Sequence, residues 1–197
     1  MSNLYSRYSQ LSICKSDIDK SIELMIDTYN RGGKVLVCGN GGSAADSEHI
    51  VGELMKGFLK KRPLKDKRIE NGLKEKLQYG LPAISLVSQS AILSAYANDC
   101  DPDLVYGQLV YGYGKDTDTL IGLSTSGNSK NVVNALKIAK SLGMRTIGLT
   151  GRNESKVSEI CDVTVRVPEI ETYKVQELHL PVYHEICIKV EEHFFDE

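Results

Sequence analysis

The sequence has 197 residues, of which 41% are hydrophobic and 25% charged, and a formal net charge of −2. This is an ordinary globular composition, which excludes disorder, collagen and low-complexity scaffolds, and the near-neutral charge argues against a nucleic-acid partner. No apolar run approaches the roughly 20 residues of a membrane span, and the first ten residues lack a signal peptide's apolar stretch, so we expect a cytoplasmic protein without a membrane partner. The five cysteines form no CxxC pair, which argues against a disulfide framework and a thiolate zinc site.

The apolar residues alternate between two patterns along the chain. Spacings of three and four residues predict helices, and short apolar runs before glycine or serine predict buried strands. In chain order these are a helix over 11–31, a strand over 34–38, a helix over 44–58, a strand over 82–87, a helix ending near 98, a helix over 102–113, a strand over 119–124, a helix between 128 and 143, strands over 144–150 and 163–167, and a helix over 173–195. The alternation predicts an α/β fold, a three-layer αβα sandwich with a central parallel sheet. No repeat or linker divides the chain, so we expect residues 1–197 to form one domain.

A basic stretch over 59–80 interrupts this pattern. Between Lys56 and Lys76, nine Lys and Arg residues stand against three Asp and Glu. Its turn-forming residues predict an irregular insertion with at most a turn or two of helix. Two interpretations stay open: a solvated charged surface, or a flap whose Lys60, Lys61 and Arg62 attract an anionic substrate.

Two loops have the composition of a phosphate site. GNGGS at Gly39–Ser43 and STSGNS at Ser124–Ser129 each follow a predicted strand and precede a predicted helix. Glycine lets the backbone approach an anion, the helix N-terminus supplies free N–H groups, and hydroxyls add donors. Turn and cap chemistry is the alternative for either loop alone. Because ligands bind at the carboxyl ends of parallel strands, two such loops together favour phosphate binding.

The first loop also matches a dinucleotide fingerprint, Gly39-x-Gly41-x-x-Ala44. That motif needs an acidic residue about 20 positions later, at the end of a second strand. Residues 59–63 read LKKRP there, which is basic and unlike a strand. We therefore expect no nucleotide cofactor.

Titratable side chains follow the first loop and recur near the C-terminus. His49 and Glu53 lie four residues apart on a predicted helix, so they share a face and form a metal-binding or acid–base pair, or a plain hydrogen-bonded pair. Gln176 and His184 lie eight residues apart on the last predicted helix, about 12 Å along a straight axis. Both reach one centre only by leaning inward, and Pro181 between them allows a kink.

Three segments, GNGGSAADSEHIVGEL, LSTSGNSKNVVNAL and VQELHLPVYH, in this order resemble the phosphoheptose isomerases of the sugar-isomerase (SIS) superfamily. The resemblance extends from about Gly32 to His193. The STSGNS loop is the superfamily's marker for phosphosugar binding, and the glutamate of HIVGEL and the last histidine of QELHLPVYH are more specific to the isomerases. It implies an SIS, flavodoxin-like topology and the aldose–ketose isomerisation of sedoheptulose 7-phosphate to D-glycero-D-manno-heptose 7-phosphate through an enediol. This reaction is the first step of nucleotide-activated heptose biosynthesis for lipopolysaccharide or capsule.

The resemblance also implies roles for individual residues. Glu53 would be the catalytic base, with His184 as its acid–base partner. A zinc ion would be surrounded by His49, Glu53, Gln176 and His184. The phosphate and sugar would be bound by Asn40, Gly41, Gly42, Ser43, Asn98, Asp99, Ser124, Thr125, Ser126, Ser129 and Gln176. The family assembles as homotetramers with active sites between subunits, and the terminal helices of this chain are available for such packing.

The chain departs from the family pattern in three places. The 59–80 insertion is longer than usual, Gln89 stands where many members carry Asp, and Tyr173-Lys174 stands where an acidic residue and Arg are usual. These positions would touch the sugar more than the phosphate, so an isomerase of a different phosphosugar stays open. The alternative of another class is a non-catalytic phosphosugar sensor or a replication-initiator-associating relative. Such relatives share the loops but lack the glutamate and the final histidine that this chain keeps.

Overall fold

The protein, described here from a computed structural model over residues 4–195, is built on a five-stranded sheet. Its strands are β1 (Val35–Cys38), β2 (Ala83–Ser85), β3 (Thr119–Leu123), β4 (Arg145–Thr150) and β5 (Val163–Arg166). Their order is β2-β1-β3-β4-β5, and all neighbouring pairs are parallel. This is the flavodoxin-like order, and it places the carboxyl ends of β1 and β3 side by side at the switch point.

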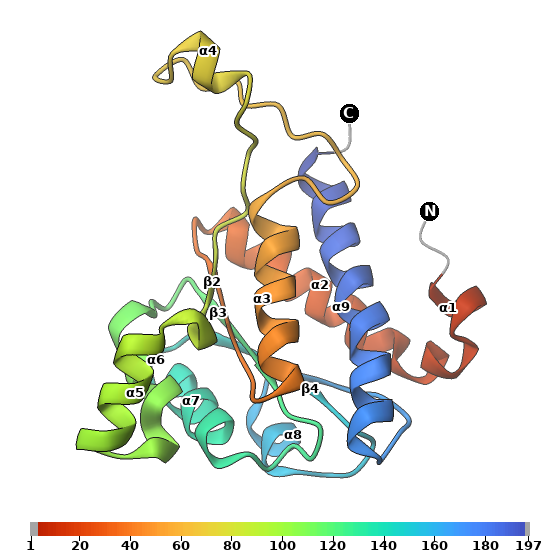
Figure 1. Cartoon of the computed structure of the whole chain (residues 1–197). Coiled ribbons are helices and arrows are strands. Elements are labelled where there is room, and N and C mark those ends of the chain that lie inside the picture. Colours follow the sequence, from red (N-terminus) through yellow and green to blue (C-terminus); the bar gives the residue numbers. More distant parts are fainter. Residues whose placement is uncertain (1–3, 196–197) are drawn as a thin grey trace.

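Helices cover both faces of the sheet, as predicted (Figure 1). One face packs against α2 (Lys15–Asn30), α3 (Gly42–Met55) and α9 (Thr172–Phe195). The other face packs against α5 (Ser90–Asp99), α6 (Val105–Tyr113), α7 (Lys130–Ser141) and α8 (Lys156–Ile160). The strand β1 is apolar at every position because alternate residues enter opposite layers: Val35 and Val37 join the first core, Leu36 and Cys38 the second.

Several boundaries differ from those predicted. The helix predicted over 11–31 is divided into a 3₁₀ turn, η1 (Ser9–Cys14), and α2, and a short α1 (Leu4–Arg7) precedes them. The strand predicted over 82–87 ends early in the 3₁₀ turn η2 (Leu86–Ser88), and η3 (Pro102–Leu104) precedes α6. The helix α8 was not predicted, although its capping box, in which Ser155 and Ser158 bond reciprocally, is a local signal. Pro181 does not interrupt α9.

The basic insertion projects from the body of the molecule (Figure 1). It contains one turn of helix, α4 (Asn71–Lys74), and a single antiparallel bridge between Pro63 and Gln78 joins its two limbs. It leaves from the C-terminal end of α3, whereas the first predicted phosphate loop lies at the N-terminal end. Arg62 differs from its basic neighbours because it is buried, so its guanidinium is not available to attract substrate from solvent.

No helix within residues 4–195 is long and apolar enough to cross a membrane.

Candidate functional site

The two glycine- and hydroxyl-rich loops lie next to each other, because β1 and β3 are neighbours. Asn40, in the first loop, exchanges two amide hydrogen bonds of 2.8 and 2.9 Å with Asn131, in the first turn of α7. The hydroxyl of Tyr106 donates to the carbonyl of Gly39 at 2.7 Å and holds the same loop from below. The helix N-termini of α3 and α7 therefore open toward a common region, where free N–H groups favour an anion.

The second loop is tightly organised. Gly127 has a φ of +65°, and its N–H donates to the carbonyl of Ser124 while its own carbonyl accepts from Val157 in α8. The hydroxyl of Ser124 donates to that of Ser129 at 3.0 Å. Thr125 and Ser126 line a hollow of about 280 Å³ whose wall also includes Glu154 and Glu169. The loop is therefore rigid, and the hydroxyls of Ser124 and Ser129 lie within hydrogen-bond distance of each other.

Three residues predicted to bind the metal or the sugar, Gln176, Asn98 and Asp99, do not contact Glu53 or His184 within one chain. Gln176 packs against Gly42 so closely that a Cβ there would come within 2.7 Å of its Nε2 atom. Asn98 and Asp99, at the end of α5, are exposed and bond to each other at 2.8 Å. Among the hydrogen bonds of residues 4–195, none joins Gln176, Asn98 or Asp99 to Glu53 or His184.

The packing of α3 against α9 brings the predicted catalytic side chains together. The Nε2 atom of His49 lies 3.1 Å from Oε1 of Glu53 and 3.4 Å from Nε2 of His184. The other carboxylate oxygen of Glu53 accepts from Lys56 at 3.2 Å. Burial, and then the neighbouring His49, lower the pKa of His184, so its ring is neutral near pH 7 and able to accept a proton.

Two residues that the sequence analysis did not single out fix the orientation of His49. The hydroxyl of Tyr183 lies 3.0 Å from Nδ1 of His49 and donates to Oδ1 of Asp46 at 3.1 Å. The contact with Tyr183 turns the His49 ring so that its Nε2 atom faces Glu53 and His184. Asp46 and His49 are three residues apart on α3 and therefore share a face of the helix, so the sequence spacing could have indicated that they lie together.

No group of three or more His, Cys, Asp and Glu side chains in the described part of the chain stands out as a ready metal site. The donor types of His49, Glu53 and His184 nevertheless suit Zn²⁺, which binds imidazole nitrogen and carboxylate oxygen. The contact between Nδ1 of His49 and the hydroxyl of Tyr183 suits the same role, because metal-binding histidines usually bond through their other nitrogen to a polar partner.

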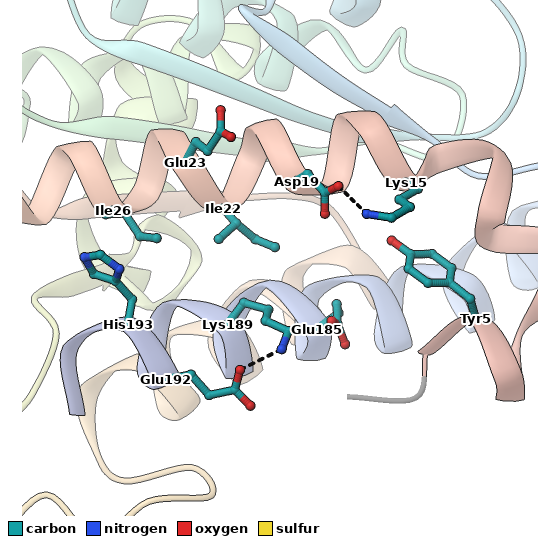
Figure 2. A pocket seen from close by; sticks show the side chains of 10 residues that line it. All are labelled: Tyr5, Lys15, Asp19, Ile22, Glu23, Ile26, Glu185, Lys189, Glu192 and His193. Carbon is teal, nitrogen blue, oxygen red and sulfur yellow. Dashed lines mark hydrogen bonds and ion pairs between the residues drawn. The ribbon is translucent and has the colours of Figure 1, made fainter. Parts of the chain in front are cut away.

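A hollow of about 700 Å³ lies between α2 and α9, and Figure 2 shows the side chains that line it. Four carboxylates and two lysines line it, and two ion pairs form within its walls, Lys15–Asp19 on α2 and Lys189–Glu192 on α9. It contains none of the predicted site residues, and its excess of carboxylates makes it a poor site for a phosphate.

His179 is a fully buried histidine on α9 for which no role was predicted. Neither ring nitrogen makes a well-formed hydrogen bond, and a weak contact with the backbone of Thr150 offsets little of the effect of burial, which lowers the pKa to about 4. The ring is therefore neutral in the folded protein across the physiological range.

This burial predicts an acid-sensitive fold. The folded pKa of about 4 lies below the ordinary 6.5, so between these values the unfolded chain binds more protons and the free energy of unfolding falls as pH falls. We expect His179 to account for a loss of about 2 kcal/mol between pH 7 and pH 5. Urea unfolding at both pH values measures it. His179→Leu should lose that part of the pH dependence, whereas the exposed control His193→Leu should keep it; an unchanged dependence in His179→Leu contradicts the assignment.

The comparisons with known proteins bear on this arrangement. The SIS domain family matches residues 6–151. The phosphoheptose isomerase of Aliarcobacter butzleri is 41% identical over 170 residues, which cover 86% of this chain and 82% of that protein. The chain belongs to the phosphoheptose isomerase family. The phosphoheptose isomerase of Helicobacter pylori is 39% identical over 177 residues, with 90% of this chain and 84% of that protein covered.

A solved phosphoheptose isomerase structure carries the same fold. The enzyme from Neisseria gonorrhoeae superposes with a TM-score of 0.75 at 31% identity, covering 94% of this chain and 96% of that one. Family membership confirms the resemblance predicted from the three motifs, and with it the assignment to the phosphosugar isomerases.

Proposed function

We propose that this chain converts sedoheptulose 7-phosphate to D-glycero-D-manno-heptose 7-phosphate. The observation that carries the proposal is the layout of α3. Its N-terminus opens at the phosphate loops, and Glu53 and His49 lie toward its other end, beside His184. A heptose 7-phosphate has its phosphate and its reacting carbons at opposite ends of the molecule, so it needs both kinds of site. Because Ser43 and Glu53 are about 15 Å apart along α3, farther than the molecule extends, this layout favours an active site that a second copy of the chain completes.

The residues support a proton-transfer mechanism through an enediol. Glu53 removes a proton from C1 of the ketose and, from the enediol, returns a proton to C2. His184 moves the proton of the C1 hydroxyl to the C2 oxygen, for which its lowered pKa is suited. The phosphate is held by the N–H groups of Gly41 and Gly42 and by the hydroxyls of Ser43, Ser124, Thr125, Ser126 and Ser129.

We include a zinc ion in this proposal, with His49, Glu53 and His184 as ligands. When bound, the ion would polarise the substrate's carbonyl and hydroxyl oxygens. Gln176 lies at the opposite end of α3, against Gly42, so it joins these ligands only if a second copy of the chain supplies it. The same argument applies to the sugar contacts of Asn98 and Asp99, and both support an active site shared between subunits, which we propose to be those of a homotetramer.

The zinc assignment predicts loss of activity on metal removal. Dialysis against a chelator should lower turnover at least tenfold, because the metal's stabilisation of developing charge is lost, and added Zn²⁺ should restore it. Elemental analysis gives an independent measurement. His49→Ala should lower the bound zinc per chain, whereas His193→Ala, on the exposed side of α9, should not. Full activity in protein that contains no zinc contradicts the assignment.

Proton NMR in D₂O tests the proposed reaction. Sedoheptulose 7-phosphate incubated with the protein and zinc should give new aldose anomeric signals, and deuterium at C2 should show exchange of the transferred proton with solvent. A folded protein that gives no aldose contradicts the proposal.

A different phosphosugar is the second candidate, supported by the departures at Gln89 and Tyr173. Gln89 accepts a hydrogen bond from Tyr113 at 3.4 Å at the start of α5, and Tyr173 is exposed at the start of α9. If heptose phosphate is not converted, other ketose phosphates in the same NMR assay identify that substrate.

A further inference from the structure

A buried ion pair lies at the point where the basic insertion leaves α3. The Nε atom of Arg62 donates to Oε1 of Glu191 at 2.8 Å, and the two side chains are 0% and 1% exposed. The Glu191 carboxylate also accepts the backbone N–H groups of Phe58 (2.8 Å), Leu59 (2.7 Å) and Lys60 (3.1 Å). Burial raises the pKa of Glu191, but the N–H groups of Leu59 and Phe58 and the charged Arg62 outweigh it and hold the pKa below its ordinary value.

The remaining N–H groups of the Arg62 guanidinium bind the C-terminal end of α3. It donates to the carbonyl of Leu54 at 2.7 Å and to that of Glu53 at 3.3 Å, and it lies 4.7 Å from the ring centre of Phe195. Carbonyls in the last turn of a helix have no partner within the helix, so the guanidinium supplies one. One of these carbonyls belongs to Glu53 itself.

Glu191 is linked to His184 in two ways, through α9 and through Phe58. Glu191 follows His184 by seven residues on α9, about two turns, so both side chains point to the same side of the helix. Glu191 also fixes the backbone of Phe58, whose ring lies 5.3 Å from that of His184. The pair therefore ties the end of α3 that carries Glu53 to the helix that carries His184.

Stability alone is a weak reason for such a pair. Removing two charges from water is costly, and apolar residues of similar volume often replace a buried pair without loss of stability. Proton transfer is far more sensitive, since a displacement of about 1 Å can lower the rate about 100-fold.

We propose that Arg62 and Glu191 are positioning residues that hold Glu53 and His184 at the separation that proton transfer requires. The inference rests on the catalytic roles given above to Glu53 and His184. In this proposal Arg62 supports the active site from inside the protein and does not belong to a surface that attracts substrate.

Arg62→Lys tests the inference with the charge retained. The single ammonium group of lysine cannot bond to Glu191 and to two carbonyls at once, as the planar guanidinium does. The C-terminal end of α3 should therefore loosen while the fold persists. We expect kcat to fall at least tenfold and KM to change by less than about twofold, because Ser43 and the phosphate loop lie about 15 Å away along α3. Arg68→Lys is the matched control. Arg68 is in the same insertion, its side chain is 87% exposed, and it pairs with Asp66, so its kinetics should stay unchanged.

A second variant covers the case in which Arg62→Lys fails to fold. Arg62→Met combined with Glu191→Gln leaves no stranded charge and keeps a carbonyl oxygen as acceptor for the backbone N–H groups that Glu191 binds, so it should fold. It should show the same fall in kcat at nearly constant KM. Unchanged kcat in either folded variant overturns the proposal, and so does a rise in KM that matches the fall in kcat, because that result indicates general loosening. Glu53→Gln is measured in parallel: if it retains turnover, the assignment of Glu53 fails, whatever Arg62 does.

Discussion

Replacing Glu53 by Gln should lower the turnover of sedoheptulose 7-phosphate at least about 100-fold. Glutamine has nearly the same shape but cannot accept a proton from carbon, so the step from ketose to enediol loses its base. Substrate binding should change little, because the phosphate loops lie at the other end of α3. The two effects separate as a fall in kcat at nearly constant KM.

The measurement is the NMR assay in D₂O, with calorimetric binding of the substrate beside it. Glu48→Gln is the matched control, because Glu48 is an exposed carboxylate on the same helix and accepts from Ser88 at 2.8 Å. This control should turn over normally. Turnover by Glu53→Gln within a few-fold of the native rate would remove Glu53 from the mechanism.

Gly127→Ala should both destabilise the protein and weaken phosphate binding. The φ of +65° at Gly127 is strained for any residue with a Cβ, and a Cβ here would lie 2.1 Å from Oγ of Ser155. Ser155 cannot easily move, because it caps α8 through its bond with Ser158. Strain and overlap together should lower the free energy of unfolding by about 3 kcal/mol.

Urea unfolding and calorimetric titration with inorganic phosphate measure the two effects, and we expect the phosphate affinity to fall at least tenfold because the loop's N–H groups are displaced. The control is Gly112→Ala, in α6, where a Cβ would meet nothing within 4 Å. That change should be neutral or stabilise by up to about 1 kcal/mol, since alanine favours a helix. An unchanged unfolding midpoint and phosphate affinity in Gly127→Ala would show that the loop tolerates a Cβ.

Much of the fold was predictable because its signals are local. The apolar runs before Gly39 and Ser124 are buried on both faces of a parallel sheet, and the glycine and hydroxyl loops after them follow from the chemistry of strand ends. The i, i+4 spacing placed His49 beside Glu53, and the structure gives 3.1 Å between them. Short elements such as α1 and α8 were missed because four or five residues carry too little periodicity.

Local sequence patterns establish the strands and the family, and they predict the phosphate loops and the acid–base pair. Which distant side chains meet depends on how the helices pack. His184 contacts His49 across 135 positions because α9 packs on α3, and Arg62 is buried because Glu191 reaches it from a helix 129 positions away. A basic residue within a basic run is indistinguishable in sequence from its solvated neighbours. Arg62 can be buried only because Glu191 pairs with it. Glu191 reaches Arg62 through the packing of α9 against the end of α3, which no local sequence pattern predicts.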